Sequence, residues 1–407
     1  MVNEPCAAQP GQRRPRLEVA DIFRSASGAF RDKYAPTPEQ RKVIAAIEQC
    51  RTAKLGGHLD VCSACGHERP AYNSCRNRHC PKCQALAQAR WIDKRSEKII
   101  PTKYFHVVFT LPQELRPLAR MNPAEMYDLL LDSAARTLLD FGLSRLHAQL
   151  GLTCVLHTWT RDLRLHPHAH CIVTAGGLDE HKYWIPARSR FLFPVKAMSK
   201  AFRGKVLAGI ENLYKNGLLT LEGRCAELAE RATFAKLKDR LYLKKWVVYA
   251  KQPFGGPEQV FQYLGRYTHR VGMSNQRLLS FDGHDVCFRT KHGKTTTINA
   301  VEFIRRFLLH VLPAGFVKIR HYGLLAAANI NTKLETARRC LLTVDNNPEP
   351  STPQAPSTWC DLFLKLTGID LLVCPACGGH IEFPLHGLGQ TIACPHCTVP
   401  VTLQMPV

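Results

Sequence analysis

Paired cysteines constrain this chain more than any other feature of its sequence. Ten of its 17 cysteines fall in two short clusters, which together contain four Cys-x2-Cys pairs. A Cys-x2-Cys turn places two thiolates on one metal ion, and zinc takes four such ligands in a tetrahedron. In a basic chain whose N-terminal stretch lacks the apolar core of a secretory signal, this spacing predicts zinc thiolates rather than disulfides. We therefore expect zinc-binding modules in a cytoplasmic protein.

The first cluster holds six cysteines and two histidines. Its candidate zinc ligands are Cys50, His58, Cys62, Cys65, Cys75, His79, Cys80 and Cys83. The two Cys-x2-Cys pairs predict one zinc site, and the eight candidates suffice for two, although the spacing leaves their pairing open. The alternative for the two histidines is that they are not ligands, in which case His79 would only donate a hydrogen bond beside Cys80.

The second cluster lies near the end of the sequence and has the spacing of a zinc ribbon. It consists of Cys374, Cys377, Cys394 and Cys397. Each cluster offers at least four soft ligands and no obvious open position, so we expect structural rather than catalytic zinc. Basic residues flank the first cluster, and we expect Arg76 and Arg78 to contact DNA. The alternative is an ordinary solvated basic surface.

The net charge of the chain indicates a polyanionic partner. The formal charge is +22 at pH 7. Self-repulsion of that size is tolerated most easily when the working partner is nucleic acid. We do not expect a membrane partner, because no apolar run reaches the roughly 18 to 20 residues that a spanning helix needs.

Changes in composition along the chain predict its domain organisation. The expected regions are a basic helical segment (1–48), a zinc-binding module (49–100), a strand-rich domain (101–340) with a basic helical insertion (180–245), a linker (341–358) and a C-terminal zinc ribbon (359–407). Capping boxes predict one helix that begins at Thr37-Pro-Glu-Gln40 and another that begins at Asn122-Pro-Ala-Glu125 and ends near Gly142. The expected strands are 104–111, 152–160, 168–174 and 246–250, followed by a hairpin over 274–298 and a helix over 300–312.

The segment Leu165-His-Pro-His-Ala-His-Cys-Ile-Val173 is a candidate metal site. Residues two apart on a strand share a face, so His168 and His170 point one way while Ala169, Cys171 and Val173 point into a core. Two imidazoles suit zinc or another transition ion, whereas added phosphate and carboxamide oxygens make magnesium or manganese plausible. The alternative is a polar strand end with solvated histidines, which His166 either extends or only flanks.

A predicted helix near residues 258–268 carries two tyrosines. Tyr263 and Tyr267 lie four residues apart and therefore share a helix face, with Gln259 one turn earlier and with Arg266 and Arg270 on a parallel cationic edge. A tyrosine hydroxyl, whose pKa is about 10, needs a nearby metal or base to attack a phosphodiester. The alternative is an aromatic stripe that packs into a core.

Three motifs together resemble a known family. They are SCRNRHCPKCQ (Ser74 to Gln84), LHTWTRDLRLHPHAHCIVTAGGL (Leu156 to Leu178) and YLGRYTHRV (Tyr263 to Val271). In type, order and separation they resemble the rolling-circle insertion-sequence transposases of the two-tyrosine His-hydrophobe-His (HUH) class, the IS91 type. The resemblance extends over about residues 40 to 330.

The resemblance implies a fold and a chemistry. The implied fold is α+β, with a ferredoxin-like or palm-like antiparallel sheet as the HUH nuclease core of region 101–340. His168 and His170 would bind catalytic Mg²⁺ or Mn²⁺, and Gln259 fits the third ligand by helical phase. Tyr263 and Tyr267 would be the nucleophiles that cut single-stranded DNA at the element ends and target DNA through a 5′-phosphotyrosine. Host polymerase would refill the donor, so the host replication machinery is a further expected partner.

Two other functions remain open at this point. A replication initiator or conjugative relaxase would use the same chemistry. A non-enzymatic, zinc-dependent DNA-binding regulator would explain the charge and the cysteines, but it would not explain why paired histidines and paired tyrosines occur together. Such a regulator would form no covalent bond with DNA.

Overall fold

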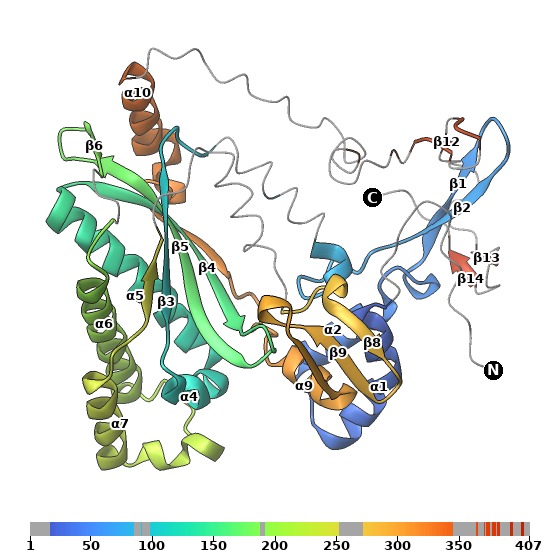
Figure 1. Ribbon diagram of the computed structural model, residues 1–407, viewed down its shortest axis with the longest axis horizontal. Coiled ribbons are helices and arrows are strands. Elements are labelled where there is room, and N and C mark those ends of the chain that lie inside the picture. Colours follow the sequence, from blue (N-terminus) through green and yellow to red (C-terminus); the bar gives the residue numbers. More distant parts are fainter. Residues whose placement is uncertain are drawn as a thin grey trace. The chain divides into compact units, whose positions relative to one another are not determined.

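The computed structural model describes residues 17–84, 91, 98–187, 192–251 and 272–344, with short pieces between residues 364 and 402. The chain divides into two compact units (Figure 1). The first unit comprises residues 1–90, 273–311 and 352–407, and the second comprises residues 91–272 and 312–351. Within the described ranges, no helix combines the length and the apolar character that crossing a bilayer requires.

The second unit is built on a six-stranded antiparallel sheet. Its strand order is β11-β4-β5-β3-β7, with β6 paired to β5. The strands are β3 (Tyr104–Thr110), β4 (Gln149–Trp159), β5 (Leu165–Leu178), β6 (Trp184–Pro186), β7 (Val248–Ala250) and β11 (Ile319–Gly323). The predicted α+β class with an antiparallel sheet is confirmed.

Helices α5 and α6 cover one face of this sheet (Figure 1). The α-helices described in the second unit are α4 (Arg116–Met121), α5 (Pro123–Phe141), α6 (Val195–Lys215), α7 (Arg231–Leu243) and α10 (Glu335–Val344). The predicted helix after Asn122 is therefore confirmed, but its capping box is not. The side-chain oxygen of Asn122 instead accepts a hydrogen bond from the backbone N–H of Thr220 at 2.6 Å.

The pleat of the sheet separates an apolar face from a polar one. Ala169, Cys171 and Val173 are fully buried in the core beneath α5 and α6, as the alternation predicted. Phe105 of β3 and Leu152 of β4 belong to the same core. Successive side chains on a strand point to opposite faces, so the even-numbered residues of β3 and β5 and the odd-numbered residues of β4 face away from these helices.

In the part of the chain that is described, the first unit combines helices with short antiparallel sheets. Its main elements are α1 (Val19–Lys33), α2 (Pro38–Gln49), β1 (Gly57–Cys62), β2 (Glu68–Tyr72), β8 (Leu278–Phe281), β9 (Asp285–Arg289), β10 (Thr295–Asn299), α9 (Ala300–Leu308), β12 (Ile381–Glu382), β13 (Thr391–Ala393) and β14 (Pro400–Thr402). The capping box of α2 forms as predicted, because Thr37 Oγ1 accepts from the Gln40 amide at 3.2 Å and Gln40 Oε1 accepts from the Thr37 amide at 3.0 Å.

The boundaries of the two units differ from the expected domains. Residues 273–311 were expected within the strand-rich domain, yet they belong to the first unit. The expected hairpin is a three-stranded meander, β8-β9-β10, and the helix after it ends at Leu308. Helix α9 packs on α1, where the ring centroids of Phe307 and Phe23 are 5.3 Å apart. The backbone N–H of Val19 donates to the side-chain oxygen of Asn275 at 3.0 Å. This long-range burial of aromatic surface could not be read from local spacing.

Candidate metal centres

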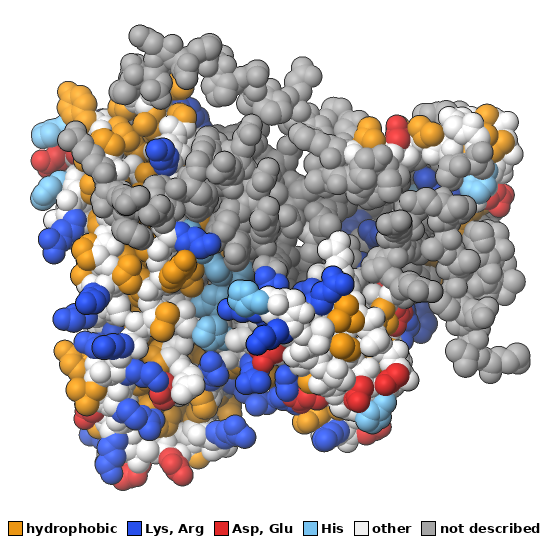
Figure 2. All heavy atoms as spheres, in the orientation of Figure 1, with side chains coloured by type: hydrophobic (Ala, Val, Ile, Leu, Met, Phe, Trp, Pro, Cys, Tyr) orange, Lys and Arg blue, Asp and Glu red, His pale blue; other side chains and the backbone are white. Residues whose placement is uncertain are grey.

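Histidines gather on the sheet face of the second unit that α5 and α6 leave uncovered. His168 and His170 lie on β5, His157 on the adjacent β4, and His106 on β3. The register places His157 directly opposite His168 and places Val155 opposite His170. Figure 2 shows histidine side chains grouped over β4 and β5 on the face of the molecule that it draws.

Three of these imidazoles are close enough to share one cation. One ring nitrogen from each of His157, His168 and His170 lies within 4.8 Å of the others. The ring centroids of His157 and His170 are 4.5 Å apart, and those of His168 and His170 are 4.9 Å apart. His157 and His170 are buried, at 4% and 8% exposure, so their positions are fixed by packing rather than by solvent.

Hydrogen bonds occupy the Nδ1 atoms of two of the three rings. His168 Nδ1 lies 2.6 Å from the carbonyl oxygen of His166, which can only accept, so Nδ1 donates and Nε2 keeps its lone pair. His170 Nδ1 lies 2.8 Å from Nε2 of His106. Such contacts are what metal-binding histidines usually make through their second nitrogen, because they fix the tautomer and the ring orientation.

Two residues of this cluster were not expected from the sequence. His157 adds a third imidazole beside His168 and His170, and His106 contacts His170 from the other side. Both lie on predicted strands. The sequence does not reveal the register between the strands, and that register determines which histidines on neighbouring strands lie side by side.

The predicted helix that carries the two tyrosines lies outside the described residues. Gln259, Tyr263, Arg266, Tyr267 and Arg270 all fall within the range 252–271. Their predicted roles therefore remain predictions.

The first unit contains two sets of four cysteines. The sulfur atoms within each set lie within 4.8 Å of one another. One set is Cys50, Cys75, Cys80 and Cys83, and the other is Cys62, Cys65, Cys374 and Cys377. Four thiolates at such separations fit tetrahedral zinc.

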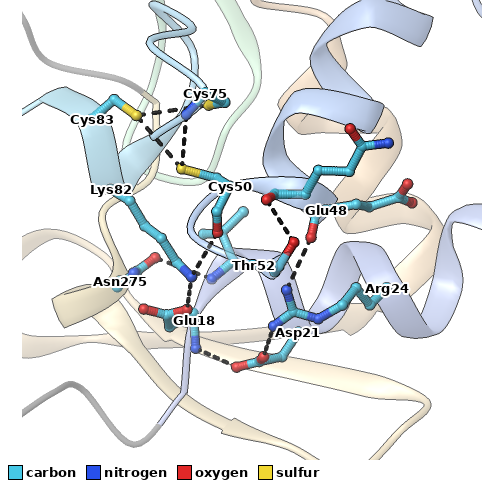
Figure 3. A network of polar contacts seen from close by, with 12 residues as sticks. Glu18, Asp21, Arg24, Glu48, Cys50, Thr52, Cys75, Lys82, Cys83 and Asn275 are labelled. Carbon is cyan, nitrogen blue, oxygen red and sulfur yellow. Dashed lines mark hydrogen bonds and ion pairs between the residues drawn. The ribbon is translucent and has the colours of Figure 1, made fainter. Parts of the chain in front are cut away.

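Cys50 sits at the end of α2, where a lysine ties the first cysteine set to the neighbouring helices (Figure 3). The Cys50 and Cys83 sulfurs are 3.6 Å apart, and Lys82 Nζ donates to the Cys50 carbonyl at 3.5 Å. Lys82 also forms an ion pair with Glu18, the residue that caps α1. The local chain is thus held in place by groups other than the cysteines.

The crowded thiols of this set need a cation if all are to be ionised. Hydrogen bonds from Cys75 and then Cys80 lower the pKa of Cys50 to about 7. The reciprocal contact with Cys50 raises the pKa of Cys80. A thiolate on one sulfur therefore disfavours a thiolate on the next, and a divalent metal ion removes this conflict.

Neither predicted histidine ligand joins these sets among the described residues. His58 lies on β1, where its Nε2 is 3.2 Å from Asp60 Oδ1. Asp60 is 2% exposed and also accepts hydrogen bonds from Arg69 at 2.7 and 2.9 Å. The buried carboxylate accounts for the position of His58 without a metal. The His79 backbone amide donates to Asn77 Oδ1 at 2.9 Å.

The second cysteine set differs from the expected C-terminal ribbon. Cys374 and Cys377 were expected to join Cys394 and Cys397, which lie outside the described residues, but they meet Cys62 and Cys65. Of the two arginines flanking the first cluster, Arg76 is exposed and Arg78 is partly buried.

Comparisons with known proteins identify two matching families and two relatives that cover most of the chain. Residues 22–111 match a family described as "Transposase zinc-binding domain", and residues 151–333 match one described as "Putative transposase". The "Putative transposase y4qJ" of Sinorhizobium fredii (strain NBRC 101917 / NGR234) is 45% identical over 371 residues, covering 88% of this chain and 92% of that protein. The "Transposase for insertion sequence element IS801" of Pseudomonas savastanoi pv. phaseolicola is 27% identical over 353 residues, covering 84% and 83%. No solved structure matches.

The chain belongs to the IS91-type insertion-sequence transposases. The resemblance drawn from the three sequence motifs is thereby confirmed. The protein is a transposase whose substrate is DNA, and its N-terminal part contains a zinc-binding domain.

Proposed function

We propose that this transposase cuts and rejoins single-stranded DNA through a 5′-phosphotyrosine, using a divalent cation held by His157, His168 and His170. The observation that carries the proposal is the convergence of three imidazoles, from two paired strands, within 4.8 Å. Three imidazoles that converge on a rigid sheet, two of them buried, form a preorganised set of nitrogen ligands for a cation.

The donor set fits a divalent ion that also accepts oxygen ligands. Three imidazoles alone suit transition ions, while phosphate oxygens and water would complete a shell acceptable to Mn²⁺ or Mg²⁺. When bound, such an ion would polarise the scissile phosphate and offset the charge that develops on it. We expect Mn²⁺ rather than Mg²⁺ at this site, because Mn²⁺ accepts nitrogen ligands and also prefers oxygen ligands.

Tyr263 and Tyr267 act as the nucleophiles in this proposal. The phenol oxygen of one tyrosine attacks phosphorus, so that a tyrosine O–P bond forms, the P–O5′ bond is kept and the P–O3′ bond breaks. The phenol loses its proton to solvent, and the departing 3′ oxygen takes up a proton from solvent to become a hydroxyl. Because the phosphotyrosine retains the energy of the broken ester, a 3′-hydroxyl can attack it and rejoin a strand without hydrolysis. Two tyrosines allow two such cuts to be held at once, at an element end and at the target.

Positive charge supplies the DNA affinity. Helices α6 and α7 carry many lysines and arginines, which Figure 2 shows spread over the surface of the second unit. We assign further phosphate contacts to Arg76, Arg78, Arg266 and Arg270. Phosphate contacts release counterions, so affinity should fall steeply with salt. The free 3′-hydroxyl left by cleavage would serve the host replication machinery as a primer.

Covalent capture tests the proposal. The full chain is incubated with an end-labelled single-stranded oligonucleotide from an element end and Mn²⁺, then separated on a denaturing gel. We expect a labelled band at the mass of the protein, lost with EDTA and lost in the Tyr263→Phe/Tyr267→Phe variant. A DNA-binding regulator would give no such band, and an undiminished band in the double variant would remove both tyrosines from the proposed role.

A further inference from the structure

Two Cys-x2-Cys turns from distant parts of the sequence meet in the first unit. Cys62 Sγ lies 3.5 Å from Cys377 Sγ, and Cys65 Sγ lies 3.8 Å from Cys374 Sγ. All four sulfurs fall within 4.8 Å of one another. Cys62 and Cys374 are buried, at 1% and 2% exposure.

The two turns have the same backbone geometry. In the first, the Gly66 amide donates to the Cys62 carbonyl at 2.8 Å and the Cys62 amide donates to the His67 carbonyl at 3.0 Å. In the second, the Gly378 amide donates to the Cys374 carbonyl at 2.9 Å and the Cys374 amide donates to the Gly379 carbonyl at 2.8 Å.

A glycine in the left-handed region follows each turn. Gly66 has φ +67° and Gly378 has φ +76°, a conformation that other residues adopt only with strain. Each turn therefore presents two sulfurs in the same way, as two halves of one site would.

Strand pairing brings the two turns together. Beyond the second turn, β12 pairs antiparallel with β1, with Cys62 opposite Ile381 and Val61 opposite Glu382 (Figure 1). A Cβ atom at Gly379 would lie 2.7 Å from the Ala64 side chain and 3.3 Å from Cys62 Sγ. Only glycine fits there, so the close approach of the second turn to the first is built into the sequence.

We infer that Cys62, Cys65, Cys374 and Cys377 hold one zinc ion between them. Four thiolates arranged as two such turns make a closed, structural zinc site. This inference goes beyond the proposed function. The matched family regions end at residues 111 and 333, so Cys374 and Cys377 lie outside both.

The shared ion makes the end of the chain a part of the zinc-binding domain. The zinc fastens Cys374, Cys377 and the neighbouring β12 to the β1–β2 hairpin, although about 300 residues separate them along the chain. The hairpin's site is completed only when the C-terminal segment is present, and loss of zinc frees that segment.

Zinc counting in paired variants of the full chain tests this inference. Zinc per chain is measured by mass spectrometry of the metal in wild type, in Cys62→Ser/Cys65→Ser, in Cys374→Ser/Cys377→Ser, and in the variant that combines all four changes. We expect each double variant to lose one ion and the fourfold variant to lose the same single ion. A fourfold variant that loses two ions would overturn the shared site, because each pair would then belong to a separate one.

A second measurement needs no variant and does not depend on their folding. The wild-type chain is treated with 1,10-phenanthroline and the thiol oxidant diamide, then digested and analysed by peptide mass spectrometry. Diamide takes up the two hydrogens of each thiol pair as a disulfide forms. We expect a disulfide joining a peptide with Cys62 or Cys65 to one with Cys374 or Cys377. Absence of that link, with Cys374 and Cys377 joined to Cys394 and Cys397 instead, would contradict the inference. Neither result bears on whether the tyrosines cut DNA.

Discussion

The Nε2 atom of His106 lies 2.8 Å from the Nδ1 atom of His170, and the two rings are almost parallel, with an interplanar angle of 3°. Burial, with smaller electrostatic effects of Lys251 and His168, lowers the pKa of His106 to about 3. His106 is therefore neutral at pH 7 and carries one ring proton. If that proton is on Nδ1, Nε2 of His106 accepts from His170 Nδ1–H, and the lone pair of His170 lies on Nε2, the atom that would bind a cation. In that tautomer His106 would position the ring of His170.

The first prediction concerns this positioning role. His106→Leu keeps an apolar side chain in the buried position but removes the acceptor, so the affinity for Mn²⁺ should fall by roughly 10- to 100-fold. His106→Gln can place an amide oxygen near the position of Nε2 and should restore part of that affinity. Mn²⁺ binding is followed by electron paramagnetic resonance, together with the Mn²⁺ concentration that half-saturates adduct formation. Equal Mn²⁺ affinity in His106→Leu and wild type would show that His106 only packs.

The second prediction concerns His157 as the third ligand. His157→Ala should lower covalent capture by about 100-fold or more, since it removes one of three imidazoles from the cation. Binding of the uncut oligonucleotide should change little, because phosphate contacts dominate that affinity. His181→Ala serves as the matched control, since His181 lies in the turn between β5 and β6 and is largely exposed. Full activity of His157→Ala at limiting Mn²⁺ would exclude the residue from the site.

The third prediction separates zinc ligands from their neighbours. Cys80→Ser should lower the zinc content by one ion per chain, because Cys80 belongs to a set of four sulfurs. His58→Ala and His79→Ala should each leave the zinc content unchanged, and His58→Ala should cost at most about 1 kcal/mol of stability through its contact with Asp60. The zinc content per chain of each purified full-length variant is measured by metal analysis and compared with that of wild type. Loss of an ion in either histidine variant would return that residue to the ligand set.

The fourth prediction concerns acid stability of the first unit. Hydrogen bonds and charges from Arg305 and then Arg306 lower the pKa of Glu302 from its usual 4.5 to about 2. Because the folded-state pKa is the lower one, the carboxylate stabilises the fold above pH 4.5, and this contribution is lost as pH falls from 4.5 towards 2.

Glu302→Gln should therefore lower the free energy of unfolding by about 1 kcal/mol at pH 7, a value reduced for the partial exposure of the pair. The difference from wild type should shrink as pH falls below 4.5. Urea unfolding at pH 7 and at pH 3.5 measures it. A difference that grows towards acid pH would contradict the assigned sign.

Local spacing predicted the elements of this fold well. The capping box at Thr37 placed the start of α2, and the alternation along β5 correctly assigned Ala169 and Cys171 to the core. These signals depend only on neighbours in sequence, because caps and pleats are local geometry.

Long-range pairing was the part that the sequence did not reveal. The register between β4 and β5 sets His157 opposite His168, and no local pattern specifies it. The partners of Cys62 and Cys65 lie near the other end of the chain, and cysteine spacing alone allows several pairings. The four cysteines were named as candidates whereas His157 was not, and in both cases the fold decided which residues met.

The most direct test of the account is to locate the covalent bond. The DNA adduct formed by the full chain with Mn²⁺ is digested with nuclease and protease, and the peptide that carries the remaining nucleotide is sequenced by mass spectrometry. We predict a phosphate ester on Tyr263 or Tyr267, formed only with a divalent cation and absent when His157, His168 and His170 are replaced by alanine. An adduct on another residue, or one that forms equally well without these three histidines, would contradict the account.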